Sequence, residues 1–283
     1  MNLLKTQLHR MVAVFMALIG STVLASANKP EPWQMTFQEA ATDNMTTITD
    51  FNNFLLILMT IITVFVLALL LYVMLRFNAK ANPTPSKTSH NTLIEVLWTV
   101  LPIVILVVIA VPSFRLLYFQ RVIPEVEMTV KAVGYQWYWG YEYPDHGDFA
   151  FDSLMLDDDE RGDQPRLLAT DTAMVVPVDT TIRVVVTGAD VLHSFAMPAF
   201  GLKIDAIPGR LNETWFKANK TGTFYGQCSE LCGIRHAFMP IRIEVVEKEA
   251  FASWVEKAQE EYAEIDSSNG QFAGLQNLTT PRQ

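Results

Sequence analysis

Three apolar segments of different length dominate the first half of the chain. The first covers residues 11–19, and the two longer ones, residues 54–75 and 96–114, contain no charged side chain. At about 1.5 Å per residue, the longer segments reach about 33 Å and about 28 Å, which is close to the hydrocarbon core of about 30 Å. They predict two transmembrane helices, although a buried helical hairpin of a soluble protein has the same pattern. Pro102 and Pro112 are tolerable in a membrane helix that packs against neighbours.

The short first segment has the pattern of a secretory signal peptide. Lys5, His9 and Arg10 precede it, and the small residues Ala25-Ser26-Ala27 follow. A short membrane helix is the alternative, because the apolar stretch falls only slightly below the length of a span once Val23 and Leu24 are included. We expect residues 1–27 to be a cleaved signal peptide and residues 28–121 to form an N-terminal segment with a transmembrane hairpin.

The loop between the two predicted spans indicates the orientation. It carries Arg76, Lys80 and Lys87 and has no acidic residue before Glu95. Such a loop stays in the cytoplasm by the positive-inside rule, although Arg115 and Arg121 beyond the second span weaken the asymmetry. An exported N-terminus followed by two crossings also returns the chain to the outside. We therefore expect residues 122–266 to form an extracytoplasmic domain.

The pattern changes after residue 122 from long apolar segments to short strands. Runs rich in β-branched residues are separated by Pro, Gly and Asp, as in a Greek-key sandwich or barrel, and they cover residues 128–133, 174–178, 181–187 and 241–246. Residues 249–264 instead have helical spacing, which places Phe251, Trp254, Val255 and Ala258 on one face. That helix is expected to serve packing only. Residues 267–283 form a polar tail, disordered or held by a partner.

A cluster of soft metal ligands lies near the end of the predicted domain. Both cysteines of the chain, Cys228 and Cys232, fall in one twelve-residue run with His236 and Met239. Thiolate, imidazole and thioether together suit copper better than zinc, calcium or magnesium. His193 is the best candidate for a further ligand. A cupredoxin-like barrel is the fold that would bring a strand end and a late loop together.

The second cysteine is more than a mononuclear blue-copper site requires, because such a site uses one Cys, two His and a weak axial Met. It indicates two copper ions bridged by both thiolates, with a backbone carbonyl in the remaining axial place. Two alternatives stay open. A disulfide is the default for two cysteines in an exported domain, although this loop would be short and strained. A zinc site would have to accept a poor thioether ligand.

The domain is strongly acidic, which favours a basic partner. From residue 122 to the end there are 13 Lys and Arg and 25 Asp and Glu, a net charge of −12 with histidine neutral. A field of one sign speeds the encounter with an oppositely charged protein and excludes nucleic acid as a partner. A merely solvated acidic loop is the alternative for residues 157–160. The docking acids expected from this pattern are Glu142, Asp145, Asp148, Asp157 and Asp158.

An aromatic segment, residues 134–145, precedes the acidic residues. On one continuous strand, alternate positions would share a face, and this face would be aromatic at Tyr135, Trp137, Trp139, Tyr141 and Tyr143. Such a face is most often part of a barrel core.

The sequence of residues 228–240, Cys-Ser-Glu-Leu-Cys-Gly-Ile-Arg-His-Ala-Phe-Met-Pro, resembles the binuclear copper A loop of cytochrome c oxidase subunit II. Gln-Trp-Tyr-Trp at residues 136–139 is similar to the aromatic motif of that family. Further similarity covers residues 90–102, 193–195 and 205–210. The resemblance implies an electron-transfer subunit of a haem-copper terminal oxidase, which accepts electrons from cytochrome c and passes them to the haem of the catalytic subunit.

The resemblance also assigns roles to single residues. One copper would be held by His193 and Met239 and the other by His236 and the carbonyl of Glu230, with Cys228 and Cys232 bridging both. The Glu230 carboxylate would reach a magnesium ion shared with the catalytic subunit. Trp137 would receive electrons, and Glu95 would stand at the mouth of a proton pathway, although a plain boundary acid is the alternative for Glu95.

The resemblance places oxygen reduction and proton pumping in a partner chain, the catalytic subunit I, so no catalytic residue for oxygen chemistry is expected here. It also implies subunit III as a further partner. Two other classes remain. A copper-free docking subunit of a quinol oxidase would share the fold but lack the cysteine pair. A membrane-anchored copper carrier could use the same ligands without needing the acidic face, Trp137 or Glu95. The absence of Cys-x-x-Cys-His excludes a fused c-type haem domain.

Overall fold

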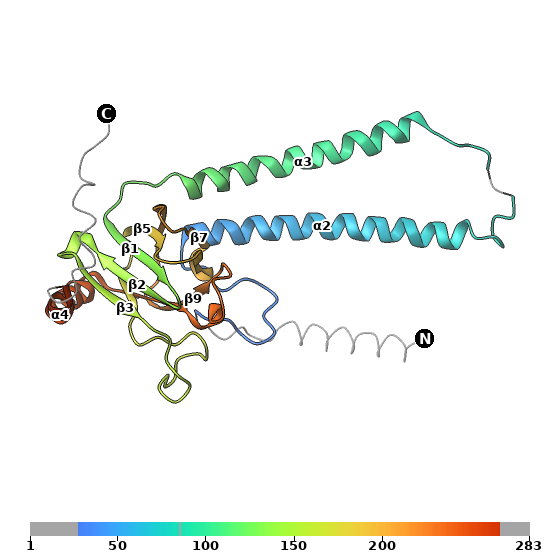
Figure 1. Cartoon of the computed structure of the whole chain (residues 1–283). Coiled ribbons are helices and arrows are strands. Elements are labelled where there is room, and N and C mark those ends of the chain that lie inside the picture. Colours follow the sequence, from blue (N-terminus) through green and yellow to red (C-terminus); the bar gives the residue numbers. More distant parts are fainter. Residues whose placement is uncertain (1–27, 85, 267–283) are drawn as a thin grey trace, which may run out of the picture.

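The computed structural model describes residues 28–84 and 86–266. They form a pair of long helices and a β domain, which lies at one end of the pair (Figure 1). The predicted signal peptide, residues 1–27, and the predicted polar tail, residues 267–283, lie outside the described residues.

The two long helices contain the two predicted spans. They are α2 (Asp43–Arg76) and α3 (Thr92–Arg121), and they run side by side away from the β domain (Figure 1). The most apolar windows have mean hydropathies of 3.1 and 2.8, and none of either window is buried within the chain. Both helices are longer than the apolar segments because polar turns extend them at their ends. The chain is a membrane protein with two spans.

Each long helix begins at a side chain that caps it. Thr42 Oγ1 accepts a hydrogen bond from the N–H of Met45, and Asn91 Oδ1 accepts one from the N–H of Ile94. These bonds satisfy N–H groups that have no partner inside the helix.

The β domain consists of two five-stranded sheets. The first has the order β3-β2-β1-β5-β8 and the second β4-β10-β9-β6-β7. Two of the ladders are parallel, β1 with β5 and β4 with β10, and the other six are antiparallel. The strands of the first sheet are β1 (Met128–Tyr135), β2 (Tyr138–Tyr143), β3 (Phe149–Ser153), β5 (Thr181–Gly188) and β8 (Asn212–Lys217). Those of the second are β4 (Met174–Pro177), β6 (His193–Met197), β7 (Leu202–Ala206), β9 (Gly222–Cys228) and β10 (Pro240–Val246).

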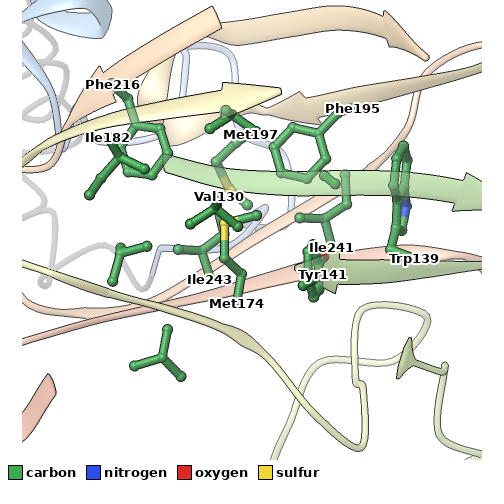
Figure 2. Packing of buried hydrophobic residues seen from close by; sticks show 14 of the residues in the cluster. Val130, Trp139, Tyr141, Met174, Ile182, Phe195, Met197, Phe216, Ile241 and Ile243 are labelled. Carbon is green, nitrogen blue, oxygen red and sulfur yellow. The ribbon is translucent and has the colours of Figure 1, made fainter. Parts of the chain in front are cut away.

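The core lies between the two sheets. Successive side chains of a strand point to opposite faces, so alternate apolar residues of each strand meet those of the facing sheet. Figure 2 shows Val130, Tyr141 and Ile182 of the first sheet among Met174, Phe195 and Ile243 of the second. The predicted cupredoxin-like β fold after a two-helix hairpin is thus confirmed, and the four predicted strands match β1, β4, β5 and β10.

The aromatic segment departs from the prediction of one continuous strand. β1 ends at Tyr135, residues 136 and 137 form a turn, and β2 starts at Tyr138. Trp139, Tyr141 and Tyr143 share the core face of β2 and are fully buried. Tyr135 and Trp137 do not belong to that face. The prediction was wrong for these two residues because the chain reverses direction between them and pairs β1 with β2.

The last helix packs on the β domain as predicted. It is α4 (Lys248–Asp266), and its buried residues include Phe251, Val255 and Ala258. Trp254, on the same face, contacts the ring of Phe149 on β3 edge to face, with 5.7 Å between the ring centroids. The helix therefore covers the β3 side of the first sheet.

The helix pair is fixed to the β domain at both of its near ends. Thr42 Oγ1 donates to the carbonyl of Phe200 over 2.9 Å, and Asn44 Nδ2 donates to that of Gly201 over 2.9 Å. The ring of Phe119, near the end of α3, meets Trp215 of β8 edge to face at 5.4 Å. These contacts orient the β domain relative to the spans.

Gly201→Ala should loosen this junction. Gly201 has a φ of +68°, and an added Cβ would lie 2.6 Å from Ile48 Cδ1 of α2. The left-handed backbone costs about 1 to 2 kcal/mol and the overlap about 1 to 3 kcal/mol, so the midpoint of thermal unfolding in detergent should fall clearly.

Gly162→Ala is a matched control, because Gly162 has a φ of +56° and no atom lies within 4 Å of the added Cβ. It should show the backbone cost alone. Combining Gly201→Ala with Ile48→Ala should recover the steric part of the loss. Equal losses for the two glycine variants, without recovery, would contradict this account of the junction.

Candidate metal centre

The predicted soft ligands come from two adjacent strands and the loop after the second. His193 is the first residue of β6, and Cys228 is the last residue of β9. β6 and β9 pair in antiparallel register, with Phe195 opposite Cys228. The loop then carries Cys232, the one-turn helix η3 (His236–Phe238), and Met239 before β10 begins. The sheet register thus brings an early histidine to a late cysteine.

The structure brings all the predicted ligands together. Cys228 Sγ lies 3.9 Å from His193 Nδ1 and 3.8 Å from Cys232 Sγ. Cys232 Sγ in turn lies 3.6 Å from His236 Nδ1 and 3.5 Å from Met239 Sδ. His193 is fully buried, and both cysteines and Met239 are buried as well, whereas His236 is half-buried. The site is therefore mostly closed to water, with His236 at its open side.

The two cysteines are free thiols in this geometry. Their 3.8 Å separation is far longer than a disulfide bond of about 2.05 Å. It is also shorter than two metal–thiolate bonds of about 2.3 Å each, so both sulfurs can bind the same ion. The donor set therefore fits a thiolate-bridged soft metal.

The thiols affect each other's protonation. Burial acts to raise the pKa of Cys228, but hydrogen bonds involving His193 and the backbone of Glu230 outweigh it and lower that pKa. Burial raises the pKa of Cys232, and repulsion by the Cys228 thiolate raises it further. The pair therefore disfavours a second negative charge. A bound cation would offset this repulsion, and metal ligation requires the thiolate form of both cysteines.

The backbone carbonyl of Glu230 faces the thiol pair, whereas the residue as a whole is exposed to solvent. Its carbonyl oxygen lies 3.3 Å from Cys228 Sγ and so faces the thiolate pair. The residue itself is exposed. The carbonyl is therefore close enough to act as a further donor at this site, and the carboxylate is available to a neighbour.

Two residues that the sequence reasoning missed hold the site together. Asp190 Oδ1 lies 2.9 Å from His193 Nε2, and Asp190 Oδ2 accepts the backbone N–H of Gln136 at 2.7 Å. A carboxylate on the far nitrogen of a ligand histidine fixes the orientation of the ring. The only local signal for the contact between Asp190 and His193 was the aspartate three residues before the histidine. Nothing in the local sequence indicates its bond to Gln136, 54 residues away.

Trp137 lies directly against the metal loop. Its Nε1 donates to the carbonyl of Cys232 at 3.2 Å, and Gln136 Nε2 donates to the same oxygen at 3.0 Å. A Cβ on Gly233 would lie 3.1 Å from Trp137 Cζ2, so the glycine permits this close approach. The indole is half-buried, and one hydrogen bond joins it to the backbone of Cys232.

The predicted docking acids fall into two groups. Asp145 Oδ2 accepts the N–H of Thr129, at the start of β1, and Asp148 lies just before β3. They lie about 20 Å along β1 from the metal end, at about 3.3 Å per residue. Glu142, between the two ends, pairs with Lys131 at 2.9 Å. This pairing offsets its charge.

The other acids lie on a long loop at the metal end. The loop of residues 154–173 follows β3, which ends at Ser153, opposite Trp139 of β2. In Figure 1 the loop lies below β3. Gln227, next to Cys228, donates to the carbonyl of Leu167 at 3.4 Å. Asp158 is shared between Arg161 and Arg166, each at 3.4 Å, while Asp157, Asp159 and Glu160 are exposed and make no ion pair with a described residue.

Glu95 is remote from this site. It lies in the first turn of α3, at the end far from the β domain. The 26 residues from Glu95 to Arg121 measure about 39 Å at about 1.5 Å per residue. The residue therefore cannot touch the thiolate cluster.

Comparisons with known families match both parts of the chain. The family model "Cytochrome C oxidase subunit II, transmembrane domain" matches residues 30–116. The model "Cytochrome C oxidase subunit II, periplasmic domain" matches residues 128–246. Together the two models cover α2, most of α3 and every strand of the β domain, and α4 lies outside them.

Individual relatives agree with the family models. A probable cytochrome c oxidase subunit 2 of Rickettsia bellii is 55% identical over 242 residues, which are 84% of this chain and 90% of the relative. Cytochrome c oxidase subunit 2 of Cereibacter sphaeroides is 47% identical over 258 residues, covering 84% of this chain and 85% of the relative. A solved periplasmic domain of subunit II of cytochrome oxidase (CoxB) of Bradyrhizobium japonicum is 67% identical, covers 50% of this chain and 99% of that chain, and has a TM-score of 0.48. The chain therefore belongs to the cytochrome c oxidase subunit II family, and is a subunit of an oxidoreductase complex.

Proposed function

We propose that this subunit accepts electrons from a cytochrome c at a binuclear copper centre and passes them to the haem of the catalytic subunit. The carrying observation is the pair of thiols 3.8 Å apart, surrounded by two imidazoles, a thioether and a carbonyl. A binuclear site uses every one of these groups. Both sulfurs bridge the two ions, and each ion takes one imidazole as a strong donor and either the thioether or the carbonyl as a weak donor. A mononuclear blue-copper site, with one Cys, two His and an axial Met, would leave one thiol and the carbonyl unused.

The proposed ligand set divides the site between two ions. His193 and Met239 would serve one copper, and His236 and the Glu230 carbonyl the other, with Cys228 and Cys232 bridging both. When bound, such a centre supplies one-electron transfer with the charge shared over two metals. The protein's part is to hold these donors in place: Asp190 fixes the His193 ring, and Gln136 and Trp137 fix the Cys232 carbonyl.

Trp137 is the proposed point at which electrons enter. Its indole is partly exposed to solvent and hydrogen-bonded to the backbone of a bridging cysteine. A donor that contacts the ring is thus one side chain away from the copper ligands. The acidic loop, residues 154–173, lies at the same end of the domain and would attract a basic donor to it.

Further roles rest on the family resemblance and on the two-span topology. We place the protein in the inner membrane with the β domain in the periplasm, bound to subunits I and III. The exposed Glu230 carboxylate would bind a magnesium ion at the interface with subunit I. Glu95, at the opposite end of α3, would receive cytoplasmic protons for the oxygen-reducing site of that subunit.

A copper carrier is the competing function for the same ligands. A carrier releases its metal to a recipient, which favours an open site with few constraints. Here most of the donors are buried, and the surrounding hydrogen bonds of Asp190, Gln136 and Trp137 fix their positions. This geometry favours a permanent centre.

The copper content tests the centre. The full chain in detergent, loaded with copper, should bind two copper ions, and its paramagnetic resonance spectrum should show one electron shared by both. Cys228→Ser or Cys232→Ser should abolish the sharing, because one bridge is lost. Ser229→Ala is a neighbouring control that should keep the spectrum. Metal analysis giving one copper per wild-type chain, or zinc retained in the presence of copper, would refute the binuclear site.

The salt dependence of cytochrome c oxidation tests the docking loop. In the assembled oxidase, Asp157→Asn with Asp159→Asn should lower the association rate and flatten its dependence on ionic strength, because the screening length is about 8 Å at physiological salt. Asp145→Asn with Asp148→Asn removes the same charge at the far end of the domain and should have a smaller effect. Equal effects of the two double variants would show that only net charge matters. Trp137→Phe should slow electron transfer and leave the affinity for cytochrome c nearly unchanged.

Glu95→Gln tests the proton role. The variant should slow oxygen turnover by the assembled complex and shift its pH dependence, while leaving the spectrum of the copper centre intact across about 39 Å of helix. Assembly must be verified by gel filtration, since a boundary acid also sets helix depth. Normal turnover at every pH would reduce Glu95 to an interfacial charge.

A further inference from the structure

We propose that a cavity between residues 35–40 and the near end of α2 binds the headgroup of an aminophospholipid, phosphatidylethanolamine. The cavity has a volume of about 290 Å³ and lies outside the metal centre. It is formed by the segment that precedes α2, residues 28–41, which we call the strap. The inference is independent of the electron-transfer function.

The strap is attached to the β domain at both ends. The carbonyl of Asn28 accepts the N–H of Tyr225 at 3.3 Å, and the N–H of Ala41 donates to the carbonyl of Ala199 at 3.0 Å. Lys220 also pairs with Glu39 near the second end. Between these anchors the strap bulges beside the start of α2, in the same direction in which the helices run (Figure 1).

The bulge presents large apolar side chains to the outside. Trp33 and Met35 are each 98% exposed, and Phe37 is 48% exposed. Trp33 follows Pro32 in a turn that the N–H of Gln34 closes onto the carbonyl of Glu31 at 3.2 Å, and its φ is +60°. This position usually belongs to glycine, so a tryptophan costs of order 1 kcal/mol there. In water, exposure of the apolar Trp33 side chain would add a further unfavourable free energy to this backbone cost.

The depth of the strap matches a membrane surface. Asp50 is the last charged residue before the apolar segment that begins at residue 54. Because a hydrocarbon core of about 30 Å needs about 20 residues, residues 46–53 of α2 fall in the headgroup layer. Tryptophan is enriched at this level of a bilayer. The side chains of Trp33 and Met35 therefore have an apolar environment next to the spans.

The cavity wall is rich in hydrogen-bond acceptors. Asp50 is exposed and makes no ion pair with a described residue, and Gln38 Oε1 is buried without a donor. The hydroxyls of Thr46 and Thr49 donate to helix carbonyls, at 3.1 and 2.8 Å, so their oxygens remain as acceptors. A cationic donor, such as a primary ammonium group, satisfies this set.

The wall of the cavity also contains hydrogen-bond donors. The backbone N–H groups of residues 35–40 make no hydrogen bond to another described residue, and the amides of Asn52 and Asn53 also line the cavity. These groups suit a phosphate. Phosphatidylethanolamine joins a phosphate to an ammonium that can donate three hydrogen bonds. Phosphatidylcholine has the same charges but no N–H donor, and an anionic headgroup would be repelled by Asp50.

Lipid retention by the full chain in detergent tests the proposal. Native mass spectrometry with added phosphatidylethanolamine or phosphatidylcholine, both with dioleoyl chains, should show tighter binding of the ethanolamine lipid by about tenfold, which is about 1.4 kcal/mol. Asp50→Asn and Gln38→Leu should each remove most of this preference. Asp43→Asn, a change of the same charge on the same helix outside the cavity, should leave it intact.

Fluorescence supplies a second reading. Brominated phosphatidylethanolamine in vesicles should quench the tryptophan fluorescence of the wild-type chain more than that of Trp33→Phe, because Trp33 lies in the strap two residues before Met35, which lines the cavity. Equal retention of the two lipids by the wild-type chain, or an unchanged preference in Asp50→Asn, would overturn the proposal. Cross-linking from residue 50 to a partner subunit in the assembled complex, with no lipid retained, would overturn it in favour of a protein side chain.

Discussion

The metal centre depends on the antiparallel register between β6 and β9. Phe195 stands opposite Cys228, and this pairing puts the His193 imidazole beside the Cys228 thiol. Side chains alternate faces along a strand, so a slip of one residue would turn the thiol away from the histidine. The short loop from Cys228 to Met239 then has only to fold back over the strand end. One ladder of backbone hydrogen bonds therefore positions ligands that are 35 residues apart in sequence.

Much of this arrangement could be predicted from the sequence because it depends on local signals. The spans are long apolar runs, and the soft ligands of one loop lie within twelve residues, so composition and spacing identified both. The roles of Asp190 and Gln136 could not be predicted, because their bond joins segments that only the parallel pairing of β1 with β5 brings together. The turn at residues 136–137 was missed for a related reason. An unbroken aromatic pattern does not show where a strand reverses.

The number of acidic residues and their positions on the β domain contribute separately to the attraction of a basic partner. The domain is acidic as a whole, yet Glu142 is paired with Lys131, and their side chains are only 18% and 16% exposed. Asp145 is held by a backbone N–H at the far end. The loop of residues 154–173 combines unpaired acids with closeness to the metal centre. The same total charge would act differently if these acids were spread evenly over the strands.

The parallel pairing of β4 with β10 has a consequence for the order of events in the cell. β10 follows the last metal ligand, Met239, and its partner strand β4 was synthesised more than sixty residues earlier. Contacts of such long range form late in folding. The proposed ligand sphere is complete only after the whole β domain has been synthesised and β10 has paired with β4. Insertion of the proposed copper ions therefore has to wait for the final strand.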